Sequence, residues 1–244
     1  MVWLKATYQP TTLFSLRPSW TTTSGGKSLL LPTPYALKMG LLDVAIRVDG
    51  IISAEVDWSW LRQMEIYIHL PPQIVVTNLF ARILRQKEFK GKKDDKAAFI
   101  AQAIADGNWP FQSTIAYREY VYHPAPIQLA FGTDESNLDT LASWLPNLNY
   151  WGKRGGFVQL IALPMPISHP DDYICMTQDV MQAGNAFPKS GLAQVVDDCD
   201  PKMKFDQANI YTTSRPKRIT RTIVLPYRLT KSSRSYSLYQ QIEG

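Results

Sequence analysis

The chain has 244 residues, of which 45% are hydrophobic and 19% are charged, and its formal net charge at pH 7 is +5. This length suits one large folded domain, or one domain with a substantial extension. No apolar run approaches the roughly 20 residues that a membrane-spanning helix needs, and residues 1–5 lack the basic lead and apolar core of a signal peptide. These features predict a cytoplasmic protein that does not bind a membrane.

The two cysteines, Cys175 and Cys199, lie far apart in the sequence, and neither has a neighbour at the spacing of a metal-ligand pair. A disulfide between them stays open as an alternative, but a reduced intracellular protein fits better. We therefore expect no metal site and no other cofactor.

Positive charge is concentrated near the C-terminus. Residues 202–240 contain nine basic side chains against the acidic Asp206, whereas the rest of the chain has 17 basic and 20 acidic side chains. This asymmetry indicates a polyanionic partner, most commonly a nucleic acid; alternatively, the segment is a basic tail that contacts only solvent. The cations that we expect to contact phosphate are Arg215, Lys217, Arg218 and Arg221.

In chain order, residues 2–16 predict two strands or one long bent strand. Residues 17–27 form a polar loop that ends in Gly-Gly-Lys without the full spacing of a P-loop. We predict a flexible loop in which Lys27 lies near nucleic-acid phosphates. Next, Thr33 and Pro34 suit the start of a helix, and apolar residues then recur at helical spacing up to residue 48. Because most of its circumference is apolar, this helix is predicted to pack on a sheet.

The middle of the chain predicts strands around a charged excursion. Residues 64–70 alternate between polar and apolar, as in a half-buried strand, and residues 73–84 are rich in β-branched side chains, as in a strand or the start of a hairpin. Residues 85–96 are almost all charged, which indicates that the chain leaves the core. A short amphipathic helix at residues 97–105 and a strand at residues 114–123 follow.

The last third predicts a strand at residues 127–131, a helix from about Glu135, and a strand at residues 157–163. Residues 171–210 look irregular and loop-rich, and a final strand at residues 219–225 precedes a polar end.

The order strand, helix, strand, strand, helix, strand is that of the ferredoxin-like (RRM-like) β-α-β-β-α-β fold, an α+β fold with both helices on one face of an antiparallel sheet. We predict such a domain at residues 1–165, with a charged or hairpin insertion at about residues 85–125. Residues 166–244 are predicted to be a basic, loop-rich extension that contains some β-structure. The fold alone does not define a function.

A glycine-rich loop with two cations lies at residues 152–156. Glycine lets backbone N–H groups approach phosphates, and the cations supply charge. The residues with these roles are Lys153, Arg154, Gly155 and Gly156. Tyr150 and Trp151 precede the loop and can stack on a base. Alternatively, the glycines only make a tight turn, and the two aromatic rings belong to the core.

The predicted strand at residues 114–123 carries several tyrosines. Alternation places Arg118, Tyr120 and Tyr122 on one face, next to Tyr117. Aromatic side chains beside arginine commonly hold unstacked bases. A tyrosine stripe that packs against the sheet explains the pattern equally well.

Two motifs carry a resemblance to a known family. The pattern Leu-Pro-Thr-Pro-x-Ala-Leu-x-x-Gly-Leu-Leu at residues 31–42 and the glycine-rich loop at residues 152–156 together resemble RNA-binding CRISPR-associated proteins of the RAMP superfamily. The first motif is most similar to Cas family five, the Cascade subunit that holds the 5′ handle of the guide RNA. The resemblance covers mainly residues 2–163.

The resemblance implies a non-catalytic prokaryotic protein that binds guide RNA (crRNA) in a type I CRISPR effector (Cascade), caps its 5′ handle and contacts the backbone and large subunits. Target DNA near its flanking motif is a further candidate partner. The family also has a protruding β-hairpin, or thumb, that contacts the guide RNA and the adjacent backbone subunit. Residues 87–96, or the strands that flank residues 117–123, are the candidates for it.

Two alternatives stay open. Some related proteins cut precursor RNA with histidine, lysine and tyrosine, a reaction that needs a base for the 2′-OH and a group that stabilises the charged phosphate. His123, Tyr122 and Lys153 are the best such set in the sequence. The other alternative is a structural assembly protein whose basic end contacts a neighbouring subunit. We expect no catalytic residue.

Overall fold

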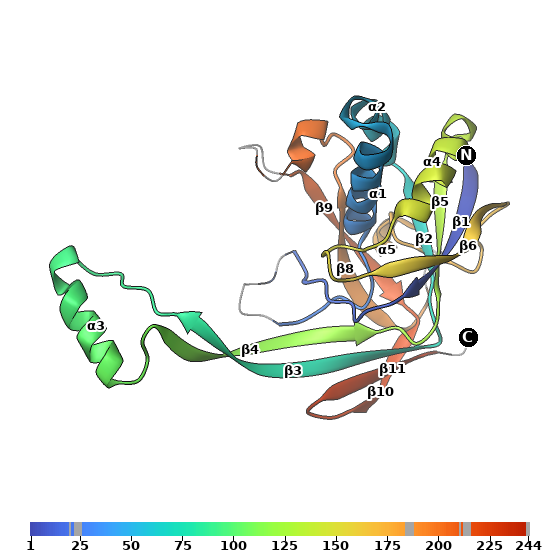
Figure 1. Cartoon of the computed structure of the whole chain (residues 1–244). Helices are drawn as coiled ribbons and strands as arrows, with labels where there is room; N and C mark the ends of the chain where they lie inside the picture. Colours follow the sequence, from blue (N-terminus) through green and yellow to red (C-terminus); the bar gives the residue numbers. More distant parts are fainter. Residues whose placement is uncertain (20, 22–25, 184–187, 210, 212–215, 243–244) are drawn as a thin grey trace.

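Antiparallel sheets and a few helices make up the protein (Figure 1), in agreement with the predicted α+β class. The computed structural model describes residues 1–19, 21, 26–183, 188–209, 211 and 216–242. No helix in these ranges is long and apolar enough to cross a membrane.

The largest sheet has the strand order β6-β1-β5-β2-β7, and each neighbouring pair is antiparallel. Its strands are β1 (Val2–Pro10), β2 (Glu65–His69), β5 (Ile127–Thr133), β6 (Val158–Ile167) and β7 (Ile174–Cys175). The polar-apolar alternation of β1 buries the even-numbered side chains from Leu4 to Tyr8 on one face.

Three helices share the hydrophobic core with that face: α1 (Pro34–Asp49), α2 (Ile51–Leu61) and α4 (Leu138–Trp144). The predicted start of α1 is confirmed, because Thr33 Oγ1 accepts a hydrogen bond from the N–H of Ala36 at 3.2 Å. Gly50 separates α1 from α2 with a φ of 84°, a backbone conformation that favours glycine.

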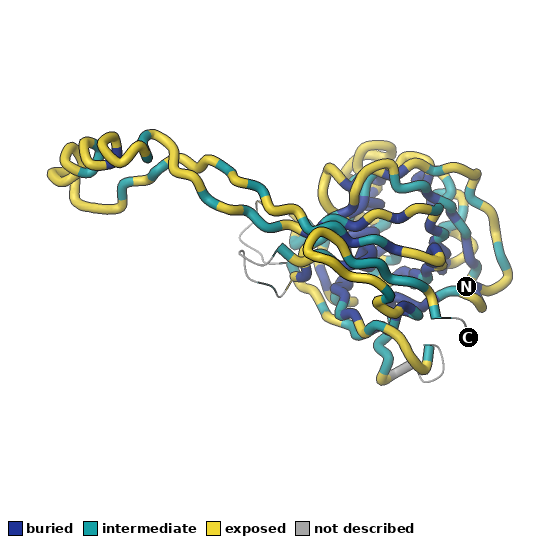
Figure 2. Tube along the Cα trace, turned by 90° about the horizontal axis from the view of Figure 1, so that it is seen from below, coloured by how far each residue is buried: buried dark blue, intermediate teal, exposed yellow. Residues whose placement is uncertain are grey.

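A second sheet, with the order β10-β11-β3-β4, extends far beyond the body of the protein. Its strands are β3 (Gln73–Gln86), β4 (Phe111–Tyr122), β10 (Tyr227–Ser232) and β11 (Tyr236–Gln241). The distal β3–β4 hairpin, with α3 (Lys96–Ala105) at its tip, projects as an arm, residues 79–118 (Figure 1). Most of the arm is exposed, in contrast to the buried interior of the body (Figure 2).

The region predicted to be loop-rich contains a third sheet. β8 (Leu192–Cys199) and β9 (Arg218–Leu225) form a hairpin that packs against α1. A buried ion pair joins the two parts, because Lys38 Nζ of α1 lies 2.7 Å from Asp198 Oδ1 of β8. β10 and β11 show that the expected polar end also forms strands.

The remaining helical turns are short: α5 (Val180–Ala183), η1 (Lys93–Asp95), η2 (Glu135–Asn137), η3 (Leu145–Asn147) and η5 (Phe205–Ala208). Side chains from β1 through β10, from Leu4 to Tyr227, belong to one hydrophobic cluster. The third sheet therefore shares its core with the first.

Candidate nucleic-acid interface

A basic groove lies where the root of the arm meets the body. It encloses about 740 Å³ and is lined by both ends of the polar loop, by β3 and β4, by the loop before β6, and by β9. Its cations are Arg17, Lys27, Arg85, Arg118, Lys153 and Arg218. Among the described residues, no acidic side chain lines it. This concentration of one sign of charge favours a polyanion.

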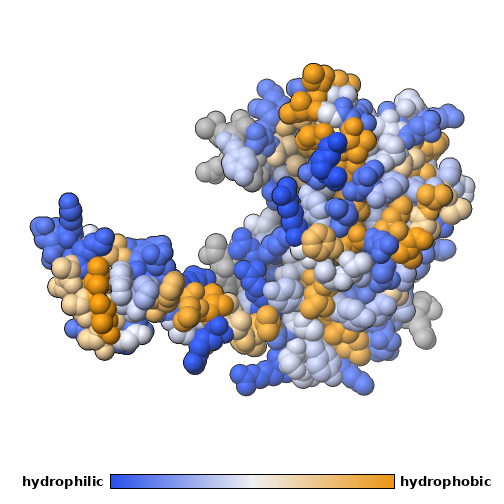
Figure 3. Space-filling model, viewed as in Figure 1, coloured by the Kyte–Doolittle hydropathy of each residue, from blue (hydrophilic) through white to orange (hydrophobic). Residues whose placement is uncertain are grey.

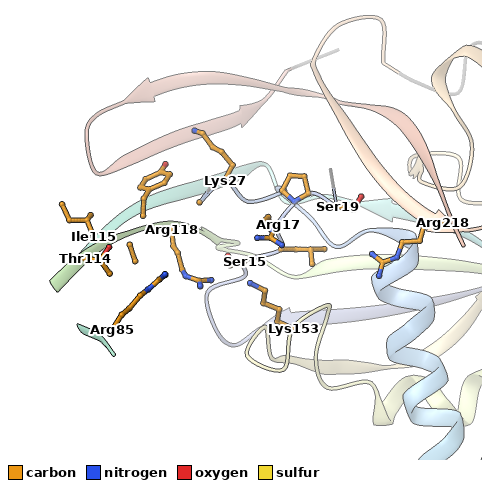
Figure 4. Close-up of a pocket in the computed structure, with 15 residues that line it drawn as sticks. Ser15, Arg17, Ser19, Lys27, Arg85, Thr114, Ile115, Arg118, Lys153 and Arg218 are labelled. Atoms are coloured by element: carbon orange, nitrogen blue, oxygen red, sulfur yellow. The ribbon is translucent and has the colours of Figure 1, made fainter. Parts of the chain in front are cut away.

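The centre of the basic groove is formed by three cations from three separate segments. Arg17, Arg118 and Lys153 point toward one another (Figure 4). Partial burial and the charges of the two arginines lower the pKa of Lys153. A bound anion would offset the electrostatic repulsion between these three cations, so this is the position in the groove best suited to a phosphate.

Lys27 and Tyr117 are held at the rim of the groove by one carboxylate. Glu119, whose side chain is 7% exposed, accepts hydrogen bonds from Lys27 Nζ at 2.6 Å, from Tyr117 Oη at 2.9 Å and from the N–H of Ser28 at 2.9 Å. The hydrogen bond to Glu119 raises the pKa of Lys27. The two residues, which the sequence places in separate segments, therefore lie side by side in the groove, with the side chain of Lys27 still 71% exposed.

The other two tyrosines of the predicted aromatic face lie elsewhere. Arg118 is exposed and lines the basic groove, whereas Tyr120 and Tyr122, further along β4, do not. Tyr122 is 49% exposed. The alternation of the strand is as predicted, but only its Arg118 end faces the groove.

The glycine-rich loop is a tight turn, and its predicted phosphate-binding backbone is not available. The N–H groups of Gly155 and Gly156 both donate to the carbonyl oxygen of Lys153, at 2.7 and 3.0 Å. Gly156 also accepts from the N–H of Trp151 at 3.0 Å. In this turn the N–H groups of the two glycines are therefore already used, which favours the alternative that the glycines make a tight turn. Lys153 and Arg154 remain exposed.

Trp151 is a core residue and not a base-stacking one. Its side chain is 1% exposed and packs edge-on against Tyr8, with ring centroids 5.5 Å apart. A base cannot reach the indole ring, so the prediction that it binds RNA is wrong. The alternative that this ring belongs to the core is correct.

The C-terminal cations have different roles. Arg218 lines the basic groove, Lys217 is exposed outside it, and Arg215 lies outside the described residues. Arg221 is only 18% exposed and pairs with Asp198 at 3.2 Å, next to Lys38. Its charge therefore compensates a buried carboxylate, and its phosphate contact stays a prediction.

His123 does not suit catalysis. It is 1% exposed, its Nε2 lies 2.7 Å from the carbonyl oxygen of Leu30, and burial lowers its pKa to about 4. It lines neither the basic groove nor a neighbouring cavity. Within the described part of the chain, no group of three or more potential His, Cys, Asp or Glu ligands could hold a metal.

Two cations of the groove were not predicted. Arg17 opens the polar loop before Lys27, and Arg85 lies at the root of the charged excursion. Their position at the edge of a polar segment could have marked both as candidate site residues, but only the fold shows that they line the same groove as Lys153.

The fold and this groove define a candidate nucleic-acid-binding protein of the α+β class. No protein-family model matches the chain. The chain is 25% identical over 213 residues to CRISPR-associated protein Cas5 of Archaeoglobus fulgidus, covering 87% of this chain and 86% of that protein. The chain is therefore similar to a Cas5 protein over most of its length, which agrees with the resemblance to Cas family five that the sequence motifs indicate.

A crystal structure of a CRISPR protein from Archaeoglobus fulgidus was also found to be similar. The match covers 99% of this chain and 92% of the chain in that crystal structure, with a TM-score of 0.48 and 12% sequence identity.

Proposed function

We propose that the protein is a non-catalytic subunit that binds guide RNA (crRNA) in a type I CRISPR effector (Cascade), where it caps the 5′ handle. The observation that carries this proposal is the basic groove, in which six cations meet without an acidic side chain in the described lining. The Cas5 homologue supports the CRISPR context.

The groove suits single-stranded RNA because its cations are arranged in a row and not clustered at a single point. Figure 4 shows them in a row from Arg85 at the root of the arm, through Arg118 and Lys153, to Arg218 near α1. Single-stranded binding releases counterions in proportion to the phosphates contacted. If all six cations make such contacts, the logarithm of the affinity should fall with the logarithm of salt concentration with a slope of about −4.

We propose that the largest sheet is a ferredoxin-like core. This is supported by the order β6-β1-β5-β2, by α1 between β1 and β2, and by α4 between β5 and β6. In this proposal residues 1–165 are the RNA-binding domain. Residues 166–244 are an extension that contributes Arg218 through the β8–β9 hairpin.

We propose that the arm contacts the guide RNA and the adjacent backbone subunit, and that the body contacts the large subunit. Apolar side chains are exposed along the arm (Figure 3), among them Leu79, Phe80, Leu84, Phe111 and Ile115. Exposed apolar surface of this kind is typical of contacts with other proteins. The complex would act in the cytoplasm of a prokaryote, and target DNA near its flanking motif would be a further partner.

The burial of His123 supports a binding role over a ribonuclease role. A general base must reach the 2′-OH of the substrate, and this imidazole lies behind the carbonyl of Leu30. Incubation of the protein alone with precursor RNA separates these alternatives, since the binding role predicts intact RNA.

The test of the binding role is the affinity for RNA with the 5′-handle sequence, measured by fluorescence anisotropy. Arg118→Glu with Lys153→Glu should weaken binding at least about 10-fold, because each reversal replaces an attractive phosphate contact by a repulsive one. The matched control is Arg228→Glu with Lys231→Glu, two exposed residues of β10 outside the groove. Absence of RNA binding, or equal losses in both double variants, would refute the proposal and favour an assembly protein.

A further inference from the structure

Arg218 is held between an aromatic ring and a carboxylate at the end of the basic groove. Its guanidinium carbon lies 3.7 Å from the centroid of the Tyr35 ring, and its Nη1 donates to Asp197 Oδ2 at 2.9 Å. Three elements meet here, since β9 supplies Arg218, β8 supplies Asp197 and α1 supplies Tyr35. The side chain is therefore oriented from two sides.

The partners of Arg218 are buried while Arg218 itself is accessible. Tyr35 is 8% exposed, the side chain of Asp197 is 9% exposed, and the side chain of Arg218 is 38% exposed. Asp197 compensates much of the arginine charge, which weakens Arg218 as a phosphate ligand. A guanidinium remains a planar, weakly hydrated surface even when it is paired, and it stacks well on aromatic rings.

The accessible side of Arg218 borders two cavities. It lines the basic groove and also a second cavity of about 940 Å³. Arg17 and Lys153 line both as well, so the two cavities adjoin. Apolar side chains form much of the second cavity, including Met39 and Leu42 of α1 and Phe205 of η5.

The groove and the second cavity offer separate surfaces for the phosphate and for the base of a nucleotide. An RNA strand whose phosphates contact the cations of the groove must place its bases on one side of the groove or the other. Toward Arg218 a base meets a flat guanidinium and apolar walls, the surroundings in which unstacked bases are usually held.

We propose that the accessible face of Arg218, supported by Tyr35 and fixed by Asp197, is a stacking platform for one nucleobase of single-stranded RNA. The base would enter the second cavity. This inference rests on the proposed RNA-binding function, and it assigns Arg218 to base contact where the sequence suggested phosphate contact.

The test compares wild-type protein with Arg218→Lys, which keeps the positive charge and removes the plane. RNA oligonucleotides carrying a single 2-aminopurine at successive positions report stacking by quenching of their fluorescence. With wild-type protein we expect strong quenching at one position. Arg218→Lys should abolish it and lower the affinity about 10-fold, within the range for loss of one stacked base, with an unchanged salt slope.

The matched control is Arg228→Lys, an exposed arginine of β10 outside both cavities, which should bind like wild type. Tyr35→Leu is a second test variant, since it removes the supporting ring and leaves Arg218 in place, and it should also lose the quenching. Circular dichroism checks that each variant is folded. RNA binding by wild-type protein with no Arg218-dependent quenching would overturn the platform alone, whereas no RNA binding by wild-type protein would overturn the proposed function itself.

Discussion

Asp198 lies at the centre of a buried ion-pair network that joins the C-terminal hairpin to α1, and Asp198→Ala tests its contribution. Asp198 accepts from Lys38 Nζ at 2.7 Å and from Arg221 Nε at 3.2 Å. The side chains of Lys38 and Asp198 are each only 2% exposed. After the substitution, the carbonyl oxygen of Arg62, at 2.9 Å, is the one partner that the buried ammonium of Lys38 keeps among the described residues. A buried charge without its counter-charge destabilises the folded state.

The expected loss in free energy of unfolding is about 3–5 kcal/mol, the usual cost of removing one partner of a buried ion pair. For a chain of this length, such a loss lowers the Tm by roughly 10 °C. Urea and thermal unfolding followed by circular dichroism measure both quantities. The control is Asp171→Ala, whose carboxylate contacts His169 Nδ1 at 2.7 Å between exposed side chains (55% for His169 and 83% for Asp171). Its expected loss is below about 1 kcal/mol.

A double variant that removes both buried charges gives a second check of the ion-pair network. Lys38→Met combined with Asp198→Leu removes both buried charges, and it should recover most of the lost stability because apolar replacement of a buried pair is close to neutral. A loss below about 1 kcal/mol for Asp198→Ala, or no recovery in the double variant, would refute the assignment of the network as the link between β8 and α1.

Three further outcomes are expected. Glu119→Gln should lower RNA affinity about threefold in anisotropy, even though it adds net positive charge, because Lys27 loses the carboxylate that positions it; tighter binding would contradict this role. Burial lowers the pKa of His123 to about 4, below its ordinary value of 6.5. The unfolded state thus binds more protons between these values, so stability should fall by up to about 3 kcal/mol as the pH drops from about 6.5 to 4. His123→Gln should flatten that part of the profile in urea unfolding. Finally, joining Gln86 to Phe111 through Asn-Gly removes the tip of the arm at a paired position of the hairpin. The Tm should change by no more than about 2 °C, because that tip is mostly exposed, and a larger fall would show that it stabilises the body.

The helix α1 and the arm could be predicted because their signals are local. Thr33 and Pro34 mark a helix start whatever surrounds them, and the apolar period then extends to the helix end. The charged run at residues 85–96 cannot form a core, and it lies within the arm, which already leaves the body at residue 79; α3 then follows as expected. How far the arm projects depends on the continuous pairing of β3 with β4, which a strand pattern alone does not specify.

Other elements were missed because their residues do not follow the usual patterns. α2 has apolar residues around much of its surface, and Ile51, Ile52 and Val56 are exposed, so no amphipathic period identifies it. β8 carries Asp197 and Asp198 at buried positions, where acidic residues ordinarily argue against a strand. They are tolerated because cations of α1 and β9 compensate them, and that pairing is visible only in the folded chain.

The same pairing explains why residue type predicted only part of the site. Arg221 and Lys38 compensate Asp198, so two cations of the chain are unavailable to a ligand. Arg218 is partly compensated by Asp197 and presents a flat face to the groove in place of a free charge. Of the cations that line the basic groove, those without a carboxylate partner among the described residues are Arg17, Arg85, Arg118 and Lys153, and none of these four belongs to the basic C-terminal segment. Most cations of the groove therefore come from outside residues 202–240, the segment whose excess of positive charge led to the prediction of a polyanionic partner. What distinguishes a binding cation from a structural one is whether the fold gives it a counter-charge, and no count of lysines and arginines contains that information.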